Sequence, residues 1–253
     1  MSGWLAIAGL GPGAAEQVTP EVTQALAQAT DLIGYAPYVA RVPERTGLAR
    51  HGSDNREELD RASLALRLAS EGKRVVVVSS GDPGVFAMAA AVFEAVDIGE
   101  PSWRELDIRV LPGISAMFAA AARIGAPLGH DFCAINLSDN LKPWELIERR
   151  LRLAAQADFV IALYNPLSKA RPWQLGRAFE LLRGELPETV PVVFASAISD
   201  AREAIETVSL RDAVAGRADM RTLVLIGSSR TRLIARAGCR PFVYTPRSTR
   251  VSS

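Results

Sequence analysis

The chain has few of the residues on which metal-cluster, redox and nucleic-acid chemistry depend. It contains only 2 cysteines and 2 histidines among 253 residues. Cys133 and Cys239 do not form a Cys-x-x-Cys pair, so the sequence predicts no metal site and two ordinary thiols of a reduced protein. The 29 basic residues nearly balance the 28 acidic ones, and the net charge of +1 argues against a general nucleic-acid-binding protein.

Long apolar runs are also missing. No run approaches the ~20 residues that span a bilayer, and the first residues, MSGWLAIAGLGPG, lack the basic segment of a secretory signal peptide. We therefore expect a cytoplasmic protein with no membrane partner. Hydrophobic residues make up 49% of the chain, which is enough to build a sizeable core.

Short apolar runs alternate with longer helical patterns through the first half of the chain. The expected strands are 4–8, 32–34, 75–78 and 108–111, and the expected helices are 20–29, 56–71, 86–96 and 115–123. This alternation predicts an α/β fold with a mainly parallel sheet and helices on its faces. Gly72 is expected to end the helix that precedes it.

A second set of such runs begins near Phe132. Its expected strands are 132–137, 159–164, 190–195 and 223–226, with helices at 146–156 and 173–182. Because Gly125–Gly129 is rich in helix breakers, we place a joint between domains at residues 125–131. The sequence thus predicts two α/β domains, residues 1–124 and 132–246, a flexible tail at 247–253, and a cleft between the domains as the default ligand site.

A glycine-rich loop, Gly9–Gly13, follows the first expected strand. Its third glycine comes too early for the dinucleotide fingerprint G-x-G-x-x-G, and Pro12 removes one backbone donor for phosphate. Asp31 begins the second expected strand, whereas a ribose-binding acid normally lies at the end of such a strand. The loop is either a tight strand–helix turn or a place where a ligand approaches the backbone closely.

The stretch Val75–Val85, VVVVSSGDPGV, ends a buried strand with an acid, a proline and two glycines. Carboxyl ends of parallel strands line the ligand crevice in such folds, so Asp82 could accept hydrogen bonds from a ligand. It could equally cap a helix that starts at Pro83. Leu111–Ala116 shows a second glycine turn with a small polar residue at a helix start, which favours a pocket for a cofactor without phosphate.

These motifs together resemble the tetrapyrrole (corrin/porphyrin) methylase family. The resemblance rests on Gly9–Gly13, Gly34–Tyr38, Ser80–Pro83 and Pro112–Ala116. It implies an S-adenosylmethionine-dependent methyltransferase that forms a homodimer. It also implies a mainly parallel N-terminal sheet, a mixed C-terminal sheet, and an active site in the cleft between the two domains.

Further motifs resemble the branch of this family that acts on precorrin-3B. They are Ala126–Phe132, Leu137–Asn140 with Pro143–Trp144, Leu163–Ser168 with Arg171, Leu225–Thr231 and Tyr244–Arg247. The resemblance implies methylation of precorrin-3B at C17, coupled to contraction of the macrocycle to give precorrin-4 on the way to cobalamin.

The resemblance also implies site residues. For S-adenosylmethionine, and for its product S-adenosylhomocysteine, they are Pro12, Gly81, Asp82, Val85, Ser115, Ala116, Tyr164, Asn165, Ala197 and Gly227. The tetrapyrrole substrate carries many carboxylates, for which arginine is well suited. Its expected contacts are Tyr35, Tyr38, Arg171 and Arg247, with Arg50, Lys142 and Lys169 as further candidates.

Methyl transfer itself needs no strong base, but ring contraction requires removal of a proton. His130 and Asp139 are the candidates for this step, and His51 is expected in a loop. Three alternatives stay open: another methylase of the same pathway acting at C11 or C20 or on uroporphyrinogen, a nicotinamide-dependent oxidoreductase, and a non-catalytic tetrapyrrole carrier.

Overall fold

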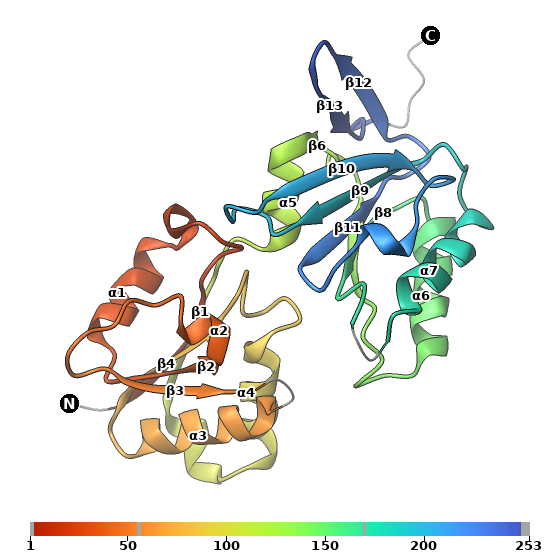
Figure 1. Ribbon diagram of the computed structural model, residues 1–253. Helices are drawn as coiled ribbons and strands as arrows, with labels where there is room; N and C mark the ends of the chain where they lie inside the picture. The colour runs from red at the N-terminus through yellow and green to blue at the C-terminus, as the bar shows by residue number, and fades with distance from the viewer. Residues whose placement is uncertain (1–2, 55–56, 169–170, 249–253) are drawn as a thin grey trace. The chain divides into compact units, whose positions relative to one another are not determined.

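The computed structural model describes residues 3–54, 57–168 and 171–248. The chain divides into two compact units between Ser115 and Ala116 (Figure 1). Within the described ranges, no helix has the length and apolar character needed to cross a bilayer.

The first unit contains one fully parallel sheet. Its strands are β1 (Trp4–Gly9), β2 (Asp31–Tyr35), β3 (Ala49–Ser53), β4 (Arg74–Ser79) and β5 (Asp107–Leu111), in the order β3-β2-β4-β1-β5. Its helices are α1 (Pro20–Gln28), α2 (Ala36–Val39), α3 (Glu58–Ser70) and α4 (Met88–Ile98), with short 3-10 turns at Ala15–Gln17 and Pro101–Glu105. The mainly parallel N-terminal sheet predicted from the sequence is confirmed.

The valines of β4 show how this sheet is buried on both faces. Val75 and Val77 belong to a core with α3 and α4 on one face, whereas Val76 and Val78 belong to a core with α1 on the other. This alternation follows from the two-residue period of a strand. Helix α1 begins where expected, because the Thr19 side chain accepts a hydrogen bond from Val22 N and Pro20 occupies the first turn.

Three details of the first unit differ from the expectation or refine it. His51 lies in β3, an edge strand that the polar sequence ARHGS did not reveal, and not in a loop. Helix α4 begins at Met88, so Pro83 does not start it, and its N-cap Ala87 receives no side-chain cap. Gly72 follows the end of α3 with a left-handed backbone, φ +85°, as expected of a terminating glycine.

The second unit contains a mixed five-stranded sheet and a small three-stranded sheet. The mixed sheet has the order β10-β9-β11-β8-β7 and is formed by β7 (Phe132–Asn136), β8 (Val160–Tyr164), β9 (Pro191–Ser196), β10 (Ala204–Ser209) and β11 (Thr222–Ile226). Only β7 and β8 are parallel in it. The small sheet contains β6 (Gly125–Ala126), β12 (Arg232–Arg236) and β13 (Cys239–Tyr244).

Helices cover both faces of the mixed sheet. Helices α6 (Trp144–Gln156) and α7 (Gln174–Arg183) pack on one face, and α5 (Ala116–Ile124) packs on the other. A 3-10 turn at Ala215–Arg217 completes the unit. The expected joint at 125–131 differs from the observed division, because α5 packs on β11 and β13 and β6 pairs with β13. Of the expected tail at 247–253, residues 249–253 lie outside the described residues.

Candidate active site

Three loops of the first unit meet backbone to backbone at the carboxyl ends of β1, β4 and β5. Gly11 and Gly81 exchange two hydrogen bonds, with N···O distances of 3.2 and 2.9 Å. A Cβ on Gly9 would lie 2.5 Å from the Gly81 oxygen, and a Cβ on Gly113 would lie 2.2 Å from the same atom. The glycines are therefore required by the close approach of the three loops, whatever ligand they hold.

Asp82 fastens two of these loops together. Its Oδ1 accepts a hydrogen bond from Gly84 N at 2.8 Å, and its Oδ2 accepts one from Gly113 N at 3.0 Å. The carboxylate thus ties the loop after β4 to the loop after β5. Of the two roles considered from the sequence, helix capping is wrong, and the structure adds a third role as a fastener between loops.

Arg41 holds the glycine loop from the other side. Its Nη2 donates to the carbonyl oxygens of Leu10 at 2.7 Å and Gly13 at 3.2 Å, and its Nη1 donates to Gly11 O at 3.1 Å. The loop that contains Pro12 is therefore fixed by a side chain that the motifs did not point to. In the sequence, Arg41 is marked only by its place shortly after the tyrosine motif Gly34–Tyr38.

The other cofactor candidates of this region lie at these turns or directly after them. Val85 closes a turn in which its N–H donates to Asp82 O at 3.3 Å. Ser115 is 2% exposed and immediately precedes Ala116, the first residue of α5.

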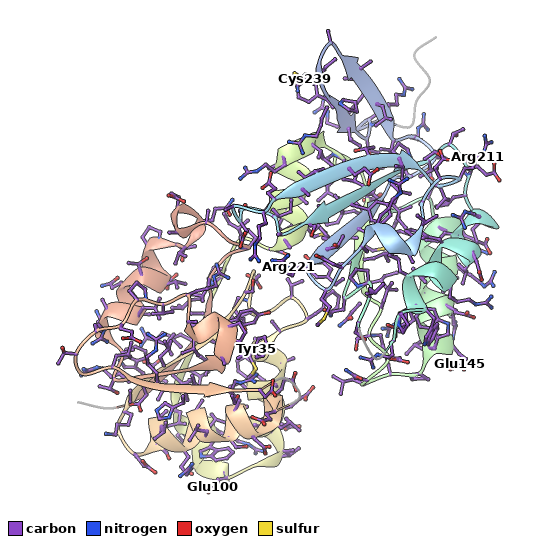
Figure 2. The ribbon with its side chains drawn as sticks, in the orientation of Figure 1. Tyr35, Glu100, Glu145, Arg211, Arg221 and Cys239 are labelled. Atoms are coloured by element: carbon purple, nitrogen blue, oxygen red, sulfur yellow. The ribbon has the colours of Figure 1, made fainter. Side chains whose placement is uncertain are left out.

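Tyr35, labelled in Figure 2, ends β2, and Tyr38 lies in the short helix α2 that follows directly. Their rings make an edge-to-face contact with centroids 5.3 Å apart. Burial and then Tyr35 raise the pKa of Tyr38, while Arg41 and Arg61 act to lower it. Both phenols are partly exposed, so they remain accessible to a ligand.

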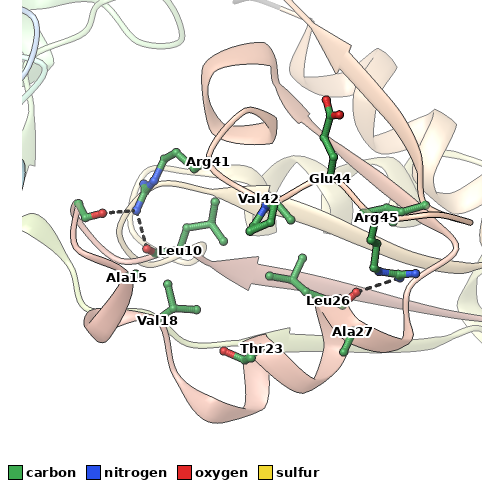
Figure 3. Close-up of a pocket in the computed structure, with 13 residues that line it drawn as sticks. Leu10, Ala15, Val18, Thr23, Leu26, Ala27, Arg41, Val42, Glu44 and Arg45 are labelled. Atoms are coloured by element: carbon green, nitrogen blue, oxygen red, sulfur yellow. Dashed lines mark hydrogen bonds between the residues drawn. The ribbon is translucent and has the colours of Figure 1, made fainter.

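A cavity of about 470 Å³ lies between α1 and the segment after α2 (Figure 3). Its walls include Leu10, Val18, Leu26 and Leu48, with Arg41 and Arg45 among the polar residues. None of the predicted site residues lines it. It therefore adjoins the glycine loop without coinciding with the predicted cofactor residues.

In the second unit, one end of the mixed sheet is formed by the carboxyl ends of β7, β8 and β9. At this edge lie Tyr164, Asn165 and Ala197. Tyr164 ends β8, and its hydroxyl accepts a hydrogen bond from Met117 N at 3.2 Å. Asn165 and Ala197 adopt left-handed backbones, with φ of +50° and +47°. Such conformations are costly for residues other than glycine and are typical of functional loops.

These residues are held by neighbours that the sequence did not single out. Asn165 Nδ2 donates to Asn136 Oδ1 at 3.0 Å, at the end of the adjacent parallel strand β7. Ala197 N donates to the backbone oxygen of Arg221 at 3.2 Å, just before β11 (Figure 2). Asn136 ends a strand in which only Ile135 is buried, so the apolar pattern of the sequence carried no strong signal for it.

Asp139 and Arg171, predicted for different roles, contact each other at the same edge. Arg171 Nη1 donates to Asp139 Oδ1 at 2.8 Å, and Gln174 Nε2 donates to the same oxygen at 3.0 Å. Gln174 is 1% exposed, which fixes this pair to the start of α7. Asp139 therefore orients Arg171.

His130 and Gly227 lie at the opposite edge of the mixed sheet. His130 precedes β7, and its Nδ1 is 3.5 Å from Asp131 Oδ2. Gly227 follows β11, which runs antiparallel to β8 and β9, and its N–H donates to Pro191 O at 2.8 Å, at the start of β9. A five-residue strand is roughly 17 Å long, so these two residues are separated from Asn165 and Asp139.

The other basic residues expected near the substrate are Arg247, Arg50, Lys142 and Lys169. Arg247 is exposed beyond β13. Arg50 donates to Val42 O at 2.8 Å and closes α2, while Lys142 Nζ donates to Ser138 O at 3.1 Å. Burial and then Arg150 lower the pKa of Lys142. Lys169 lies outside the described residues.

His51 Nε2 lies 2.9 Å from Asp31 Oδ1, so the two side chains form a pair within the first sheet. Across the described parts of the chain, no three His, Cys, Asp or Glu side chains are grouped to hold a metal ion.

Comparison with known proteins defines the class. The family model for Tetrapyrrole (Corrin/Porphyrin) Methylases matches residues 5–214, and the chain belongs to this family. It is thus a methyltransferase with the two-unit α/β fold of that family.

Particular relatives are more similar still. A precorrin-3B C(17)-methyltransferase from Sinorhizobium sp is 60% identical over 247 residues, covering 98% of this chain and 97% of the relative. The crystal structure of the methyltransferase CobJ matches with a TM-score of 0.92 at 60% identity, covering 97% of this chain and 100% of that one. The cobalamin biosynthesis protein CobIJ of Mycobacterium tuberculosis is 47% identical over 98% of this chain, which spans 48% of that protein.

Proposed function

We propose that this chain transfers a methyl group from S-adenosylmethionine to C17 of precorrin-3B, with contraction of the macrocycle to precorrin-4, in cobalamin biosynthesis. The observation that carries the proposal is the 60% identity to a precorrin-3B C(17)-methyltransferase over nearly the full length of both chains. The hydrogen-bonded loops at the carboxyl ends of β1, β4 and β5 support it, because such ends are the usual ligand-binding edge of a parallel sheet.

The residues present fit S-adenosylmethionine better than a dinucleotide. The loops offer backbone groups and one carboxylate, and Pro12 removes a phosphate donor. The proposed contacts are Pro12, Gly81, Asp82, Val85, Ser115, Ala116, Tyr164, Asn165 and Ala197. Gly227 is left out, because it lies at the other edge of its sheet from Asn165 and Ala197. The bound cofactor would supply an electrophilic methyl group on sulfur.

The chain's main contribution would be to hold two reactants in register. Fixing reactants in a near-attack geometry can contribute about 7–11 kcal/mol to lowering a barrier. Preorganised loops suit this task, since Asp82 and Arg41 hold the glycine loops from two sides. Arg171, oriented by Asp139, and Arg247 are the proposed contacts for substrate carboxylates.

For ring contraction, we propose that either Asp139 or His130 assists proton removal. The two lie at opposite ends of β7, so they cannot serve the same substrate atom. Asp139→Asn and His130→Gln variants should separate them, with methylation and contraction measured independently. If both variants carry out both steps at the parent rate, neither residue has this role.

The decisive experiment is incubation of the purified chain with precorrin-3B and S-adenosylmethionine labelled with carbon-13 in its methyl group. A single labelled methyl at C17 in the product NMR spectrum is the expected result. Label at C11 or C20 would identify another methylase of the pathway. Absence of label, with binding of NADH but not of S-adenosylhomocysteine by calorimetry, would identify an oxidoreductase.

We also propose a homodimer. The second unit exposes Phe118 and Phe132, whose rings stack edge to face with centroids 6.3 Å apart, and Leu233, Ile234 and Phe242 of the β12–β13 hairpin. Exposed apolar side chains of this size are common at protein interfaces. Light scattering after size-exclusion chromatography should give twice the chain mass of 27.2 kDa; a monomer at all concentrations would refute the dimer.

A further inference from the structure

Arg61 is a buried cation without an acidic partner. It belongs to α3 and is only 6% exposed. Its Nε donates to Ser53 Oγ at 2.9 Å, its Nη2 to Asp54 O at 2.7 Å, and its Nη1 to the thioether sulfur of Met88 at 3.3 Å. Among residues 3–54, 57–168 and 171–248, no carboxylate lies within ion-pair distance of this guanidinium.

This arrangement is unusual for stability alone. A buried charge is normally paired with an opposite charge, because hydrogen bonds to neutral partners do not offset the free-energy cost of removing it from water. A thioether is a weak acceptor, so one arm of the guanidinium is poorly satisfied. An apolar side chain or a glutamine would connect β3 to α4 without leaving a charge in the protein. The charge itself therefore needs an explanation.

The position of Arg61 supplies one. Ser53, which it binds, is the register partner of Tyr35 across β3 and β2, and their side chains share one face of the sheet. Tyr35 in turn contacts Tyr38. In the described part of the chain, neither phenol hydroxyl has a hydrogen-bond partner. Two unused donors thus lie near the carboxyl end of β2, on the strand that neighbours the Ser53 contact of the buried charge.

A second cation reinforces this field. Arg41 lies near Tyr38, and its guanidinium donates to loop carbonyls and to Ser80 Oγ. Burial and then Tyr35 raise the pKa of the Tyr38 phenol, and both arginines act against that rise. The charge of Arg61 thus lies among acceptors that carry no charge, Ser53 Oγ, Asp54 O and Met88 Sδ, which is the electrostatic condition for binding an anion nearby.

We propose that Tyr35 and Tyr38 donate to one carboxylate of the tetrapyrrole, and that Arg61 supplies its counter-charge from behind Ser53. Arg61 is then a specificity-determining residue that favours polycarboxylate macrocycles. The inference rests on the proposed function for the identity of the ligand, but it concerns a subsite within the first unit alone.

The test measures binding of uroporphyrin, a stable tetrapyrrole polycarboxylate, by fluorescence quenching. Arg61→Gln should weaken binding by about tenfold or more, since a charge-assisted interaction is lost. Arg61→Lys should recover most of the affinity, because it keeps the charge. Arg67→Gln is the matched control, because Arg67 lies on the same helix, is exposed, and loses the same charge. Binding of S-adenosylhomocysteine should be unchanged in all three.

Two further measurements separate this role from that of a structural bracket, meaning a side chain that only holds β3 and α4 together through its hydrogen bonds. Removing the charge should reduce the salt dependence of uroporphyrin binding, whereas a bracket would leave it unchanged. Tyr38→Phe keeps the ring contact and should weaken binding severalfold, with little added loss in combination with Arg61→Gln, because both act on the same carboxylate. This variant also serves if Arg61→Gln fails to fold.

Unchanged affinity of Arg61→Gln and of Tyr38→Phe would overturn the subsite. So would equal losses in Arg61→Lys and Arg61→Gln with an unchanged salt dependence, because the residue would then be a bracket. If the parent protein itself binds S-adenosylhomocysteine but no uroporphyrin, the proposed tetrapyrrole function fails together with the subsite.

Discussion

Substitution of Asp82 is the sharpest test of how the cofactor loops are held. Asp82→Asn keeps the size of the side chain but leaves one oxygen for two donors, the N–H groups of Gly84 and Gly113. The amide nitrogen must then face one of these N–H groups. The variant therefore loses one hydrogen bond to a charged acceptor and weakens the other.

The magnitude follows from the two contacts. A hydrogen bond to a charged group contributes about 1.5–3 kcal/mol, and a neutral one about 0.5–1.5 kcal/mol. Because Gly84 N is exposed, the low end applies there. We expect a loss of about 2 kcal/mol from the first unit, and a larger loss for Asp82→Ala. If binding must restore the loop order, the Kd for S-adenosylhomocysteine should rise by roughly tenfold or more.

Differential scanning calorimetry and isothermal titration with S-adenosylhomocysteine measure the two effects. Asp97→Asn is the control, because Asp97 is exposed in the same unit and its carboxylate has no contact in the described chain. If Asp82→Asn unfolds and binds like this control, the fastening of the two loops has no energetic importance and the reasoning is refuted.

Gly113→Ala should abolish S-adenosylhomocysteine binding in calorimetry, because its Cβ would lie 2.2 Å from Gly81 O; retained affinity would mean that the loops can separate freely. Gly176→Ala, within α7, should instead stabilise the protein by about 0.5–1 kcal/mol, because no atom of the described residues outside its own helix backbone lies within 4 Å of the position that its Cβ would occupy; a lower melting temperature would contradict this. Burial raises the pKa of Cys133 to about 11, so at about pH 8 its thiol stays protonated. A short iodoacetamide pulse followed by peptide mass spectrometry should label the exposed Cys239 first, with Cys133 gaining label only as the pH approaches about 11.

Most of the fold could be predicted from the sequence, because buried strands appear as continuous apolar runs. The apolar runs at 75–78 and 223–226 lie within β4 and β11. Strands with mixed composition were missed, namely β3, β10 and the β12–β13 hairpin. Residues of β12 are exposed throughout, so no alternation of buried and exposed positions could mark that strand.

The site was predicted less evenly. Motifs located the turns with Gly81 and Asn165, but motifs alone cannot give strand direction. The resemblance listed Gly227 together with Asn165, and the antiparallel course of β11 places the two at opposite ends of the mixed sheet. Contacts between distant segments, such as that of Arg171 with Asp139, likewise could not be predicted from the sequence.

The mutual contact of Gly9, Gly81 and Gly113 has a consequence for protein engineering. Libraries that diversify one of these turns at a time should yield almost only inactive clones, because each residue change collides with main chain that is held constant. Altered cofactor preference should instead be sought by grafting all three turns together from a related methylase, so that their fit to one another is inherited intact.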